Sequence, residues 1–326
     1  MTSPIVECTL CPRRCRLRNG ERGDCRVRLN LDGKLYSLVF GNPCSVHVDP
    51  VEKKPMYHVL PASSSFSLAT AGCNLHCKYC QNWEISQVPP EETENYNLTP
   101  EQIVQAALNE RCRSIAYTYS DPVVFYEYTL ATSRLAKEKG LINIFRTAAY
   151  IEPEPLEELC AYVQTASVDL KGITEEFYKK ICAGTLAPVL KALKIMKKNG
   201  VWIEITNLVV PTWNDSAEDI RGLSRWVLDN LGPDTPIHFS RFWPMHQLQN
   251  LPPTPVRTLA AAYDIAKKEG LRYVYIGNVP EHIGNNTVCP TDGKTLIRRV
   301  GYSILENHIV NGACEYCGTK IPGIWS

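Results

Sequence analysis

The feature that most constrains this chain is a closely spaced set of three cysteines, Cys73, Cys77 and Cys80, in the segment AGCNLHCKYCQNW. A strand-like apolar run over residues 66–70 precedes the segment, so the cysteines are expected on a loop at the end of a strand. Three thiolates at this C-x3-C-x2-C spacing can hold three irons of a four-iron, four-sulfide (4Fe-4S) cluster and leave the fourth iron open. The spacing therefore predicts an iron–sulfur site with one free coordination position.

An open iron of this kind can support chemistry that a fully ligated cluster cannot. It can chelate the amino and carboxylate groups of S-adenosylmethionine and pass one electron to the sulfonium, which releases a 5′-deoxyadenosyl radical that abstracts hydrogen. Two simpler interpretations are half of a zinc knuckle and a thioredoxin-like redox pair formed by Cys77 and Cys80. The cluster is favoured because a zinc site needs a fourth ligand nearby and a redox pair does not need Cys73.

Motifs that resemble a known family are spread over nearly the whole chain: CKYCQNW, VDLKG, EITNLVVPTWND, HFSRF, YVYIGNVP and the terminal CxxCG and IPGIW. They resemble the radical enzyme of the AmmeMemoRadiSam system, a group related to the activating enzymes of pyruvate formate-lyase. This resemblance implies a radical S-adenosylmethionine enzyme in which Tyr79 lies against the adenine of the cosubstrate. It also implies Memo-like and AMMECR-type proteins as functional partners.

Charge and cysteine content narrow the compartment and the partners. The 326 residues include 35 Lys and Arg against 34 Asp and Glu, and this net charge of +1 gives no general attraction to nucleic acid or membranes. The first residues lack an apolar signal core and no run of 18 apolar residues occurs, so a soluble cytoplasmic protein is expected. Fourteen cysteines in such a protein indicate metal ligation rather than disulfides, because the cytosol keeps thiols reduced.

The N-terminal segment carries a second cysteine set, Cys8, Cys11, Cys15 and Cys25, in a C-x2-C-x3-C-x9-C pattern. Four thiolates so close in the chain can close a zinc or iron site or hold a second iron–sulfur cluster, and the spacing leaves these options open. Arginines in the same segment could bind phosphate. No aromatic residues are interleaved with them, so solvated arginines that offset thiolate charge are favoured. A hairpin with an Asp-Gly turn is expected over residues 29–41.

From residue 66 onward strand-like and helix-like stretches alternate, and polar residues gather at the ends of the expected strands, as in (β/α) barrels. The sequence predicts an α/β fold, a partial (β/α)6-type parallel barrel over residues 61–280. Small Cys-rich metal-binding modules are expected at 1–60 and 281–326. Strands are expected at 66–70, 114–120, 142–150, 166–171, 201–210, 237–243 and 273–278, and helices at 99–109, 123–139, 153–163, 174–181, 187–199, 216–231 and 254–269.

The C-terminal module carries three further cysteines, Cys289, Cys314 and Cys317, next to glycines and a proline in knuckle-like positions. In the family the first knuckle is normally C-P-x-C-G, but Asp292 replaces its second cysteine here. Three thiolates and a carboxylate can still bind zinc or iron, although less tightly to a soft ion. A metal site is expected, and the alternative is a metal-free knuckle.

Strand-end residues are the candidate contacts to S-adenosylmethionine. The resemblance places Asp121 where the superfamily presents a glycine-rich GGE-P motif to the methionyl amino group, although both glycines are absent. It places Asp169 and Lys171, the D-x-K pattern of the activating-enzyme relatives, beside the carboxylate and a bound monovalent cation. His238 is a further candidate ligand contact or proton relay. Structural roles stay open: a helix cap for Asp121, an ion pair for Asp169 with Lys171, and a buried polar group for His238.

These observations lead to one main hypothesis and its rivals. The main hypothesis is an enzyme that cleaves S-adenosylmethionine reductively and uses the radical on an unidentified substrate, with an unidentified one-electron donor. One branch activates a glycyl-radical enzyme, and another modifies a small molecule, an RNA base or a protein side chain. A rival of another class is a non-catalytic iron–sulfur or zinc carrier or scaffold. The intact three-cysteine motif favours the enzyme.

Overall fold

The computed structural model describes residues 4–326 and centres on one eight-stranded sheet in the order β12-β11-β10-β9-β8-β7-β6-β5. From β6 to β12 each strand runs parallel to the next one in the chain, whereas β5 is antiparallel to β6. The strands are β5 Ser45–Pro50, β6 Ser64–Ala69, β7 Ser114–Tyr117, β8 Ile142–Thr147, β9 Thr165–Asp169, β10 Trp202–Val209, β11 Ile237–Arg241 and β12 Val274–Gly277.

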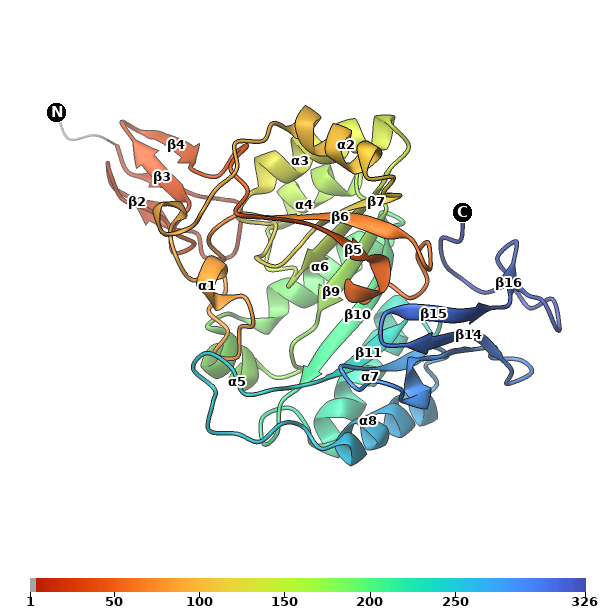
Figure 1. Cartoon of the computed structure of the whole chain (residues 1–326). Coiled ribbons are helices and arrows are strands. Elements are labelled where there is room, and N and C mark those ends of the chain that lie inside the picture. Colours follow the sequence, from red (N-terminus) through yellow and green to blue (C-terminus); the bar gives the residue numbers. More distant parts are fainter. Residues whose placement is uncertain (1–3) are drawn as a thin grey trace.

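Helices connect the parallel strands and cover the outside of the curved sheet (Figure 1). β5 and β12 are the two edge strands, so the barrel stays open between them. The predicted partial parallel barrel is confirmed. The helices of this part are α1 Trp83–Ser86, η2 Pro90–Glu92, α2 Pro100–Asn109, α3 Tyr126–Glu138, α4 Pro153–Cys160, α5 Glu175–Phe177, η3 Tyr178–Cys182, α6 Leu186–Lys198, α7 Ala217–Leu231 and α8 Val256–Glu269.

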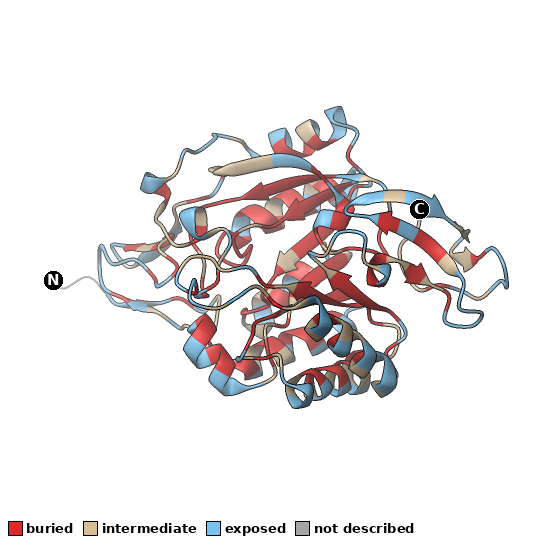
Figure 2. Cartoon of the chain, turned by 60° about the horizontal axis from the view of Figure 1, so that its bottom comes forward, coloured by how far each residue is buried: buried red, intermediate tan, exposed pale blue. Residues whose placement is uncertain are grey.

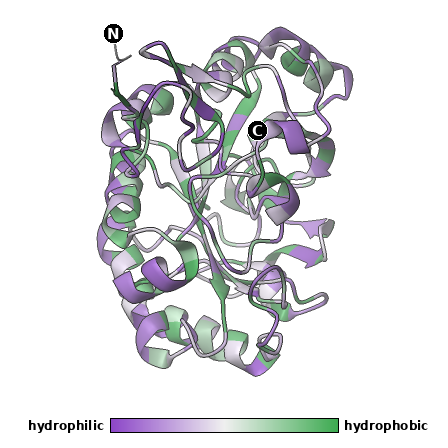
Figure 3. Ribbon diagram, turned by 90° about the vertical axis from the view of Figure 1, so that its left-hand side faces the viewer, coloured by the Kyte–Doolittle hydropathy of each residue, from purple (hydrophilic) through white to green (hydrophobic). Residues whose placement is uncertain are grey.

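The burial of the strands and helices follows from their positions in these layers. Strand residues such as Ile144 and Ile205 are fully buried because the sheet is covered on both faces. In α8 only one stripe is buried, formed by Leu259, Ala262 and Ala266. Figure 2 shows buried strands inside helices with exposed outer sides, and Figure 3 shows alternating apolar and hydrophilic stripes on the helices. In residues 4–326, no helix combines the length and apolar character needed to span a bilayer.

Two local sequence signals have the predicted structure. Thr99 and Gln102 form a reciprocal capping box at the start of α2, in which each side chain accepts a hydrogen bond from the backbone N–H of the other residue. Asp32 and Gly33 have φ angles of 50° and 83° and join β3 to β4 in the predicted hairpin. Each of these structures depends on residues that are close in the chain.

Two helical segments differ from the prediction. α3 begins later than expected, at Tyr126, because a hydrogen-bonded turn that begins at Asp121 follows β7. The helix expected over residues 174–181 is interrupted: α5 ends at Phe177 and the chain widens into the π-helical turn η3. The π-turn places the backbone carbonyl groups of its last residues against the cysteine loop.

The N-terminal module consists of small strand pairs, and its last strand joins the central sheet. β5 pairs with β6 along its whole length. The boundary expected at residue 60, between the N-terminal module and the barrel, therefore falls between two paired strands. A single 3-10 turn, η1 Val51–Lys53, follows β5 and lies beside the mouth of the barrel. The small strands are β1 Val6–Glu7, β2 Arg16–Leu17, β3 Arg28–Leu31 and β4 Lys34–Ser37.

The C-terminal module packs against the barrel beside β12. Leu296 and Ile297 bury their side chains in one cluster with Tyr275 of β12. Arg299 is buried and donates a 2.9 Å hydrogen bond to the carbonyl oxygen of Tyr57. The module therefore covers the edge that the open barrel would otherwise expose. Its elements are η4 Ile283–Asn285, β13 Thr287–Val288, β14 Thr295–Val300, β15 Ser303–Asn307, β16 Ile309–Val310 and β17 Ala313–Cys314.

Candidate functional site

A cleft of about 340 Å³ opens at the carboxyl ends of the parallel strands, where barrel enzymes place their chemistry. The loop after β6 brings the three-cysteine motif to this cleft, and the ends of later strands bring charged side chains. The N-terminal and C-terminal cysteine sets lie at other places in the fold. The cleft brings together seven residues predicted from sequence, which are Cys73, Cys77, Tyr79, Cys80, Asp121, Asp169 and Lys171.

The cysteine loop is held in place by hydrogen bonds to loops that follow later strands. The side chain of Asn74 donates to the carbonyl oxygen of Tyr150 at 2.7 Å. The backbone N–H of His76 donates to the carbonyl oxygen of Cys182, at the end of the π-turn, at 3.0 Å. These bonds satisfy buried backbone groups and fix the loop before any ligand binds.

The three thiols of the motif lie in surroundings that disfavour a free thiolate. Burial raises the pKa of Cys73 well above its usual value, and the charge of Asp121 adds to this shift. A hydrogen bond with Cys182, together with burial, raises the pKa of Cys77, and burial raises that of Cys80. A bound metal keeps its thiolate ligands deprotonated. In residues 4–326 these sulfurs do not converge as ligands of a single ion would, which fits a cluster that binds each thiolate to a different iron.

Asp169, Arg146 and Lys171 form a charged group beside the cysteines. Arg146 donates to Oδ1 of Asp169, and Nζ of Lys171 lies 3.0 Å from Oδ2. Burial alone would raise the pKa of Asp169, but the charges of Arg146 and Lys171 lower it below its usual value, so the carboxylate stays ionised. Nζ of Lys171 also lies 5.8 Å from the ring centroid of Tyr79. The group carries two cations for one carboxylate and therefore has a positive excess.

Asp121 faces the cleft and also joins the ends of β7 and β8. Its Oδ1 accepts hydrogen bonds from Oγ1 of Thr147 at 2.8 Å and from the N–H of Val123 at 3.1 Å, and its Oδ2 accepts one from the N–H of Ala148 at 2.8 Å. Burial raises the pKa of Asp121, and these bonds oppose the shift. A carboxylate offers about four acceptor sites, so Oδ2 retains capacity for a ligand.

His238 does not line the cleft that holds the other predicted cofactor contacts. Alternation along β11 puts His238 and Ser240 on the same side of the strand, but only Ser240 lines the cleft. His238 lies one layer deeper, where its Nε2 is 2.8 Å from Oε2 of Glu204 and its ring stacks on Tyr275. Burial lowers the pKa of His238, although the carboxylate of Glu204 opposes this. These contacts fit the alternative interpretation of His238 as a buried polar group.

Sequence reasoning missed three cationic side chains of the cleft, which are Lys53, Lys54 and Arg146. Arg146 was recognisable as the one charged residue within the apolar run INIFRT. Lys54 is 2% exposed, and its Nζ lies 2.5 Å from Oδ2 of Asp49 and 4.5 Å from the ring centroid of Tyr119. Burial lowers the pKa of Lys54 to about 8, against the opposing effect of Asp49. The mixed charges of VDPVEKKP, at the end of β5 and in η1, were the only sequence signal for it.

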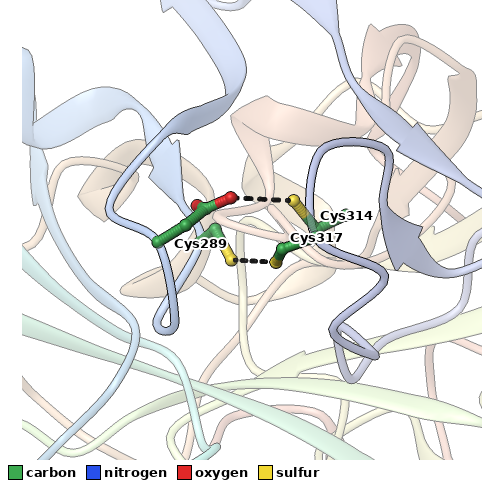
Figure 4. A group of neighbouring side chains, drawn as sticks. Cys289, Cys314 and Cys317 are labelled. Carbon is green, nitrogen blue, oxygen red and sulfur yellow. Dashed lines mark hydrogen bonds between the residues drawn. The ribbon is translucent and has the colours of Figure 1, made fainter.

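The C-terminal cysteines form a compact ligand set. Cys289, Asp292, Cys314 and Cys317 each offer one atom within 4.8 Å of all the others. Figure 4 shows the side chains of Cys289, Cys314 and Cys317 converging from two loops. The sulfurs of Cys289 and Cys317 are 3.6 Å apart, and Sγ of Cys314 is 3.7 Å from Oδ2 of Asp292. Three sulfurs and one carboxylate oxygen at these separations can hold a single tetrahedral zinc or iron ion, as predicted.

Comparison with known proteins gives the family. The family model of the radical SAM superfamily matches residues 67–224, which contain the cysteine loop together with Asp121, Asp169 and Lys171. This chain belongs to the radical SAM superfamily. A 4Fe-4S cluster and S-adenosylmethionine follow from this membership, and the three buried thiols and the charged cleft fit both groups.

Individual relatives of this radical SAM protein cover different parts of the chain. The uncharacterized protein MJ0808 of Methanocaldococcus jannaschii is 47% identical over 318 residues, which are 97% of this chain and 95% of that protein. The pyruvate formate-lyase-activating enzyme of Clostridium pasteurianum is 25% identical over 165 residues, which are 48% of this chain and 66% of that enzyme. A radical SAM methyltransferase from Sphaerobacter thermophilus superposes with a TM-score of 0.55 at 14% identity, over 72% of this chain and 71% of that one. The last similarity concerns the fold alone.

Proposed function

We propose that this protein cleaves S-adenosylmethionine reductively and uses the resulting 5′-deoxyadenosyl radical to abstract hydrogen from a substrate. A bound 4Fe-4S cluster supplies the electron and the open iron for this chemistry. The observation that carries the proposal is that the three-cysteine motif shares one cleft with the charges of Asp121, Asp169 and Lys171. Membership of the radical SAM superfamily supports the same reaction.

The charges of the cleft match the two ends of the methionine part of the cosubstrate. Arg146 and Lys171 surround one ionised carboxylate, so they offer a positive excess to the carboxylate of S-adenosylmethionine. Oδ2 of Asp121 can accept a further hydrogen bond from the ammonium group of S-adenosylmethionine. Tyr79 lies beside Lys171 and provides an aromatic face for the adenine. These side chains bind and orient the cosubstrate against the cysteine loop.

Release of 5′-deoxyadenosine under anaerobic, reducing conditions tests the proposal. Combined Cys73→Ala, Cys77→Ala and Cys80→Ala substitutions should abolish the product. Cys160→Ala removes a half-buried thiol outside the motif and should leave the product unchanged, so it is the matched control. Undiminished product in the triple variant overturns the proposal. A fully iron-loaded native protein that makes no product favours a non-catalytic iron–sulfur carrier instead.

A second candidate narrows the substrate to a glycyl-radical enzyme. Similarity to the pyruvate formate-lyase-activating enzyme of Clostridium pasteurianum supports it. In this version the radical removes one hydrogen from a glycine of a partner protein, and an external one-electron donor completes the reaction. The wider proposal includes Memo-like and AMMECR-type partners, on the sequence resemblance alone. Deuterium transfer from a labelled substrate into 5′-deoxyadenosine separates a glycine donor from a small-molecule donor.

A further inference from the structure

A small cavity under the N-terminal module is lined by all four cysteines of its motif. The cavity has a volume of about 20 Å³, and Leu10, Val123 and Val124 supply its apolar walls. A Cβ built on Gly23 would lie 3.7 Å from Sγ of one cysteine and 3.8 Å from Sγ of another, so two thiols converge where the chain has no side chain. The four cysteines on this cavity are Cys8, Cys11, Cys15 and Cys25.

The separation of these thiols favours a cluster over a single ion. One zinc or iron ion holds its sulfur ligands about 2.3 Å away and so within about 4 Å of one another. In residues 4–326, only the C-terminal group brings three or more ligand atoms within 4.8 Å of one another. The N-terminal cysteines surround a shared cavity without reaching that spacing. A four-iron cluster has this requirement, because each thiolate binds a different iron.

A buried arginine beside the cavity has an unused hydrogen-bond donor. Arg28 is 4% exposed and lines the cavity. Its two terminal nitrogens donate to the carboxylate of Glu127 at 2.5 and 2.7 Å, but its Nε has no partner. A buried donor without a partner destabilises the fold, so a partner is expected. The sulfides and thiolates of a negatively charged cluster would provide an acceptor and a counter-charge.

The N-terminal cysteine segment touches the loop of the three-cysteine motif directly. Nε of Arg13 donates to the carbonyl oxygen of Asn74, the residue after Cys73, at 3.0 Å. Asn74 also lines the small cavity. Oδ2 of Asp24 lies 2.7 Å from Nε2 of His76, which stands within the motif. The two cysteine sets are therefore joined by direct contacts rather than by an intervening domain.

We infer that Cys8, Cys11, Cys15 and Cys25 bind a second 4Fe-4S cluster and that this cluster delivers electrons to the cleft. An external low-potential one-electron donor reduces the second cluster by one electron. That electron then passes to the cluster at the three-cysteine motif, so the second cluster is reoxidised and the first is reduced, with no transfer of atoms. The delivery step rests on the proposed function, whereas the binding of the second cluster does not.

Iron and acid-labile sulfide counts test the second cluster without any assay of activity. The native protein, reconstituted anaerobically, should hold two clusters' worth of sulfide. The triple Ala variant at positions 73, 77 and 80 leaves the N-terminal set intact and should keep about half of that sulfide, because four thiolates suffice for one cluster. Cys11→Ala with Cys15→Ala should keep the other half, and Cys44→Ala should lose none. The inference is overturned if the triple Ala variant contains zinc and no acid-labile sulfide. It is also overturned if the variant with Cys11→Ala and Cys15→Ala keeps as much sulfide as the native protein.

Electron paramagnetic resonance of the reduced proteins tests the placement of the two clusters. Two reduced clusters in contacting segments should couple magnetically, so the native spectrum should differ from the sum of the spectra of the two cluster-deficient variants. A native spectrum equal to that sum overturns electron delivery between them. If both clusters are found and coupled but no 5′-deoxyadenosine forms, the proposed function fails while the second cluster stands.

Discussion

Nδ1 of His58 lies 2.7 Å from the carbonyl oxygen of Pro322, a residue 264 positions further along the chain. On the other side of the ring, Nε2 lies 2.7 Å from the hydroxyl of Tyr275 in β12. Burial lowers the pKa of His58 and leaves the imidazole neutral, so when Nδ1 donates to the carbonyl oxygen, Nε2 accepts from the tyrosine. A neutral histidine therefore connects the barrel to the C-terminal end of the chain.

Acid should weaken this connection. Burial lowers the pKa of His58 to about 4 from an ordinary value of 6.5, although the charge of Glu204 opposes the shift. The unfolded chain then binds the proton more readily, so the stabilisation is complete above about pH 6.5 and is lost as the pH falls toward about 4. The loss should be about 2 kcal/mol at about pH 5. Urea unfolding at several pH values measures the free energy of unfolding, and His58→Gln should flatten its dependence on pH. An unchanged dependence in that variant would assign the acid sensitivity to other groups.

Arg146→Gln should weaken binding of S-adenosylmethionine, because Asp169 would keep only Lys171 and the positive excess of this three-residue group would disappear. We expect a loss of about tenfold in affinity, equivalent to about 1.4 kcal/mol, with little change in iron content or melting temperature. Arg134→Gln removes an exposed arginine from its ion pair with Glu158 and should leave the affinity unchanged. Equilibrium binding under anaerobic conditions provides the measurement. Native-like affinity in Arg146→Gln would mean that the arginine only supports the fold.

Gly72→Ala should separate the two cysteine segments. Gly72 has a φ of +86°, and a Cβ there would lie 2.4 Å from the carbonyl oxygen of Cys25, which cannot move as a flexible side chain would. Gly140→Ala is the control, because Gly140 has a φ of +76° but no atom near its Cβ position. The control should cost about 1–2 kcal/mol for backbone strain alone, and Gly72→Ala about 2–5 kcal/mol once steric overlap is added. Denaturant unfolding compares the two, and equal losses would contradict the close contact.

Metal retention at the C-terminal site should depend on residue 292. Asp292→Cys completes a set of four thiolates and should keep its ion under a chelator concentration that empties the native site, whereas Cys314→Ser should lose it first. The N-terminal set already has four thiolates and should retain its metal longer than the native C-terminal site. Element-resolved metal counts before and after chelation decide this order. Equal retention in all three proteins would show that Asp292 is not a ligand.

The sequence by itself determined the features that depend on neighbouring residues. The spacing of Cys73, Cys77 and Cys80 predicted the iron–sulfur loop, and the alternation of apolar runs and stripes predicted the parallel barrel. The capping box of Thr99 with Gln102 followed in the same way. The cysteine spacing and the capping box join residues a few positions apart, and the barrel was predicted from the periodicity within each strand and helix, so all three patterns are visible in the chain.

Only the tertiary structure decided which strand residues reach the cleft. Alternation gives the side of a strand that a residue occupies, but its depth depends on the stagger between neighbouring strands. The stagger pairs His238 with Thr206 in the sheet, but the side chain of His238 lies below the cleft, beside Glu204. On β8, by contrast, the side chain of Arg146 reaches Asp169. The tertiary structure also decided the contact between the segments of Gly72 and Cys25. Such a contact joins residues that are distant in the chain, so it depends on how separate elements pack.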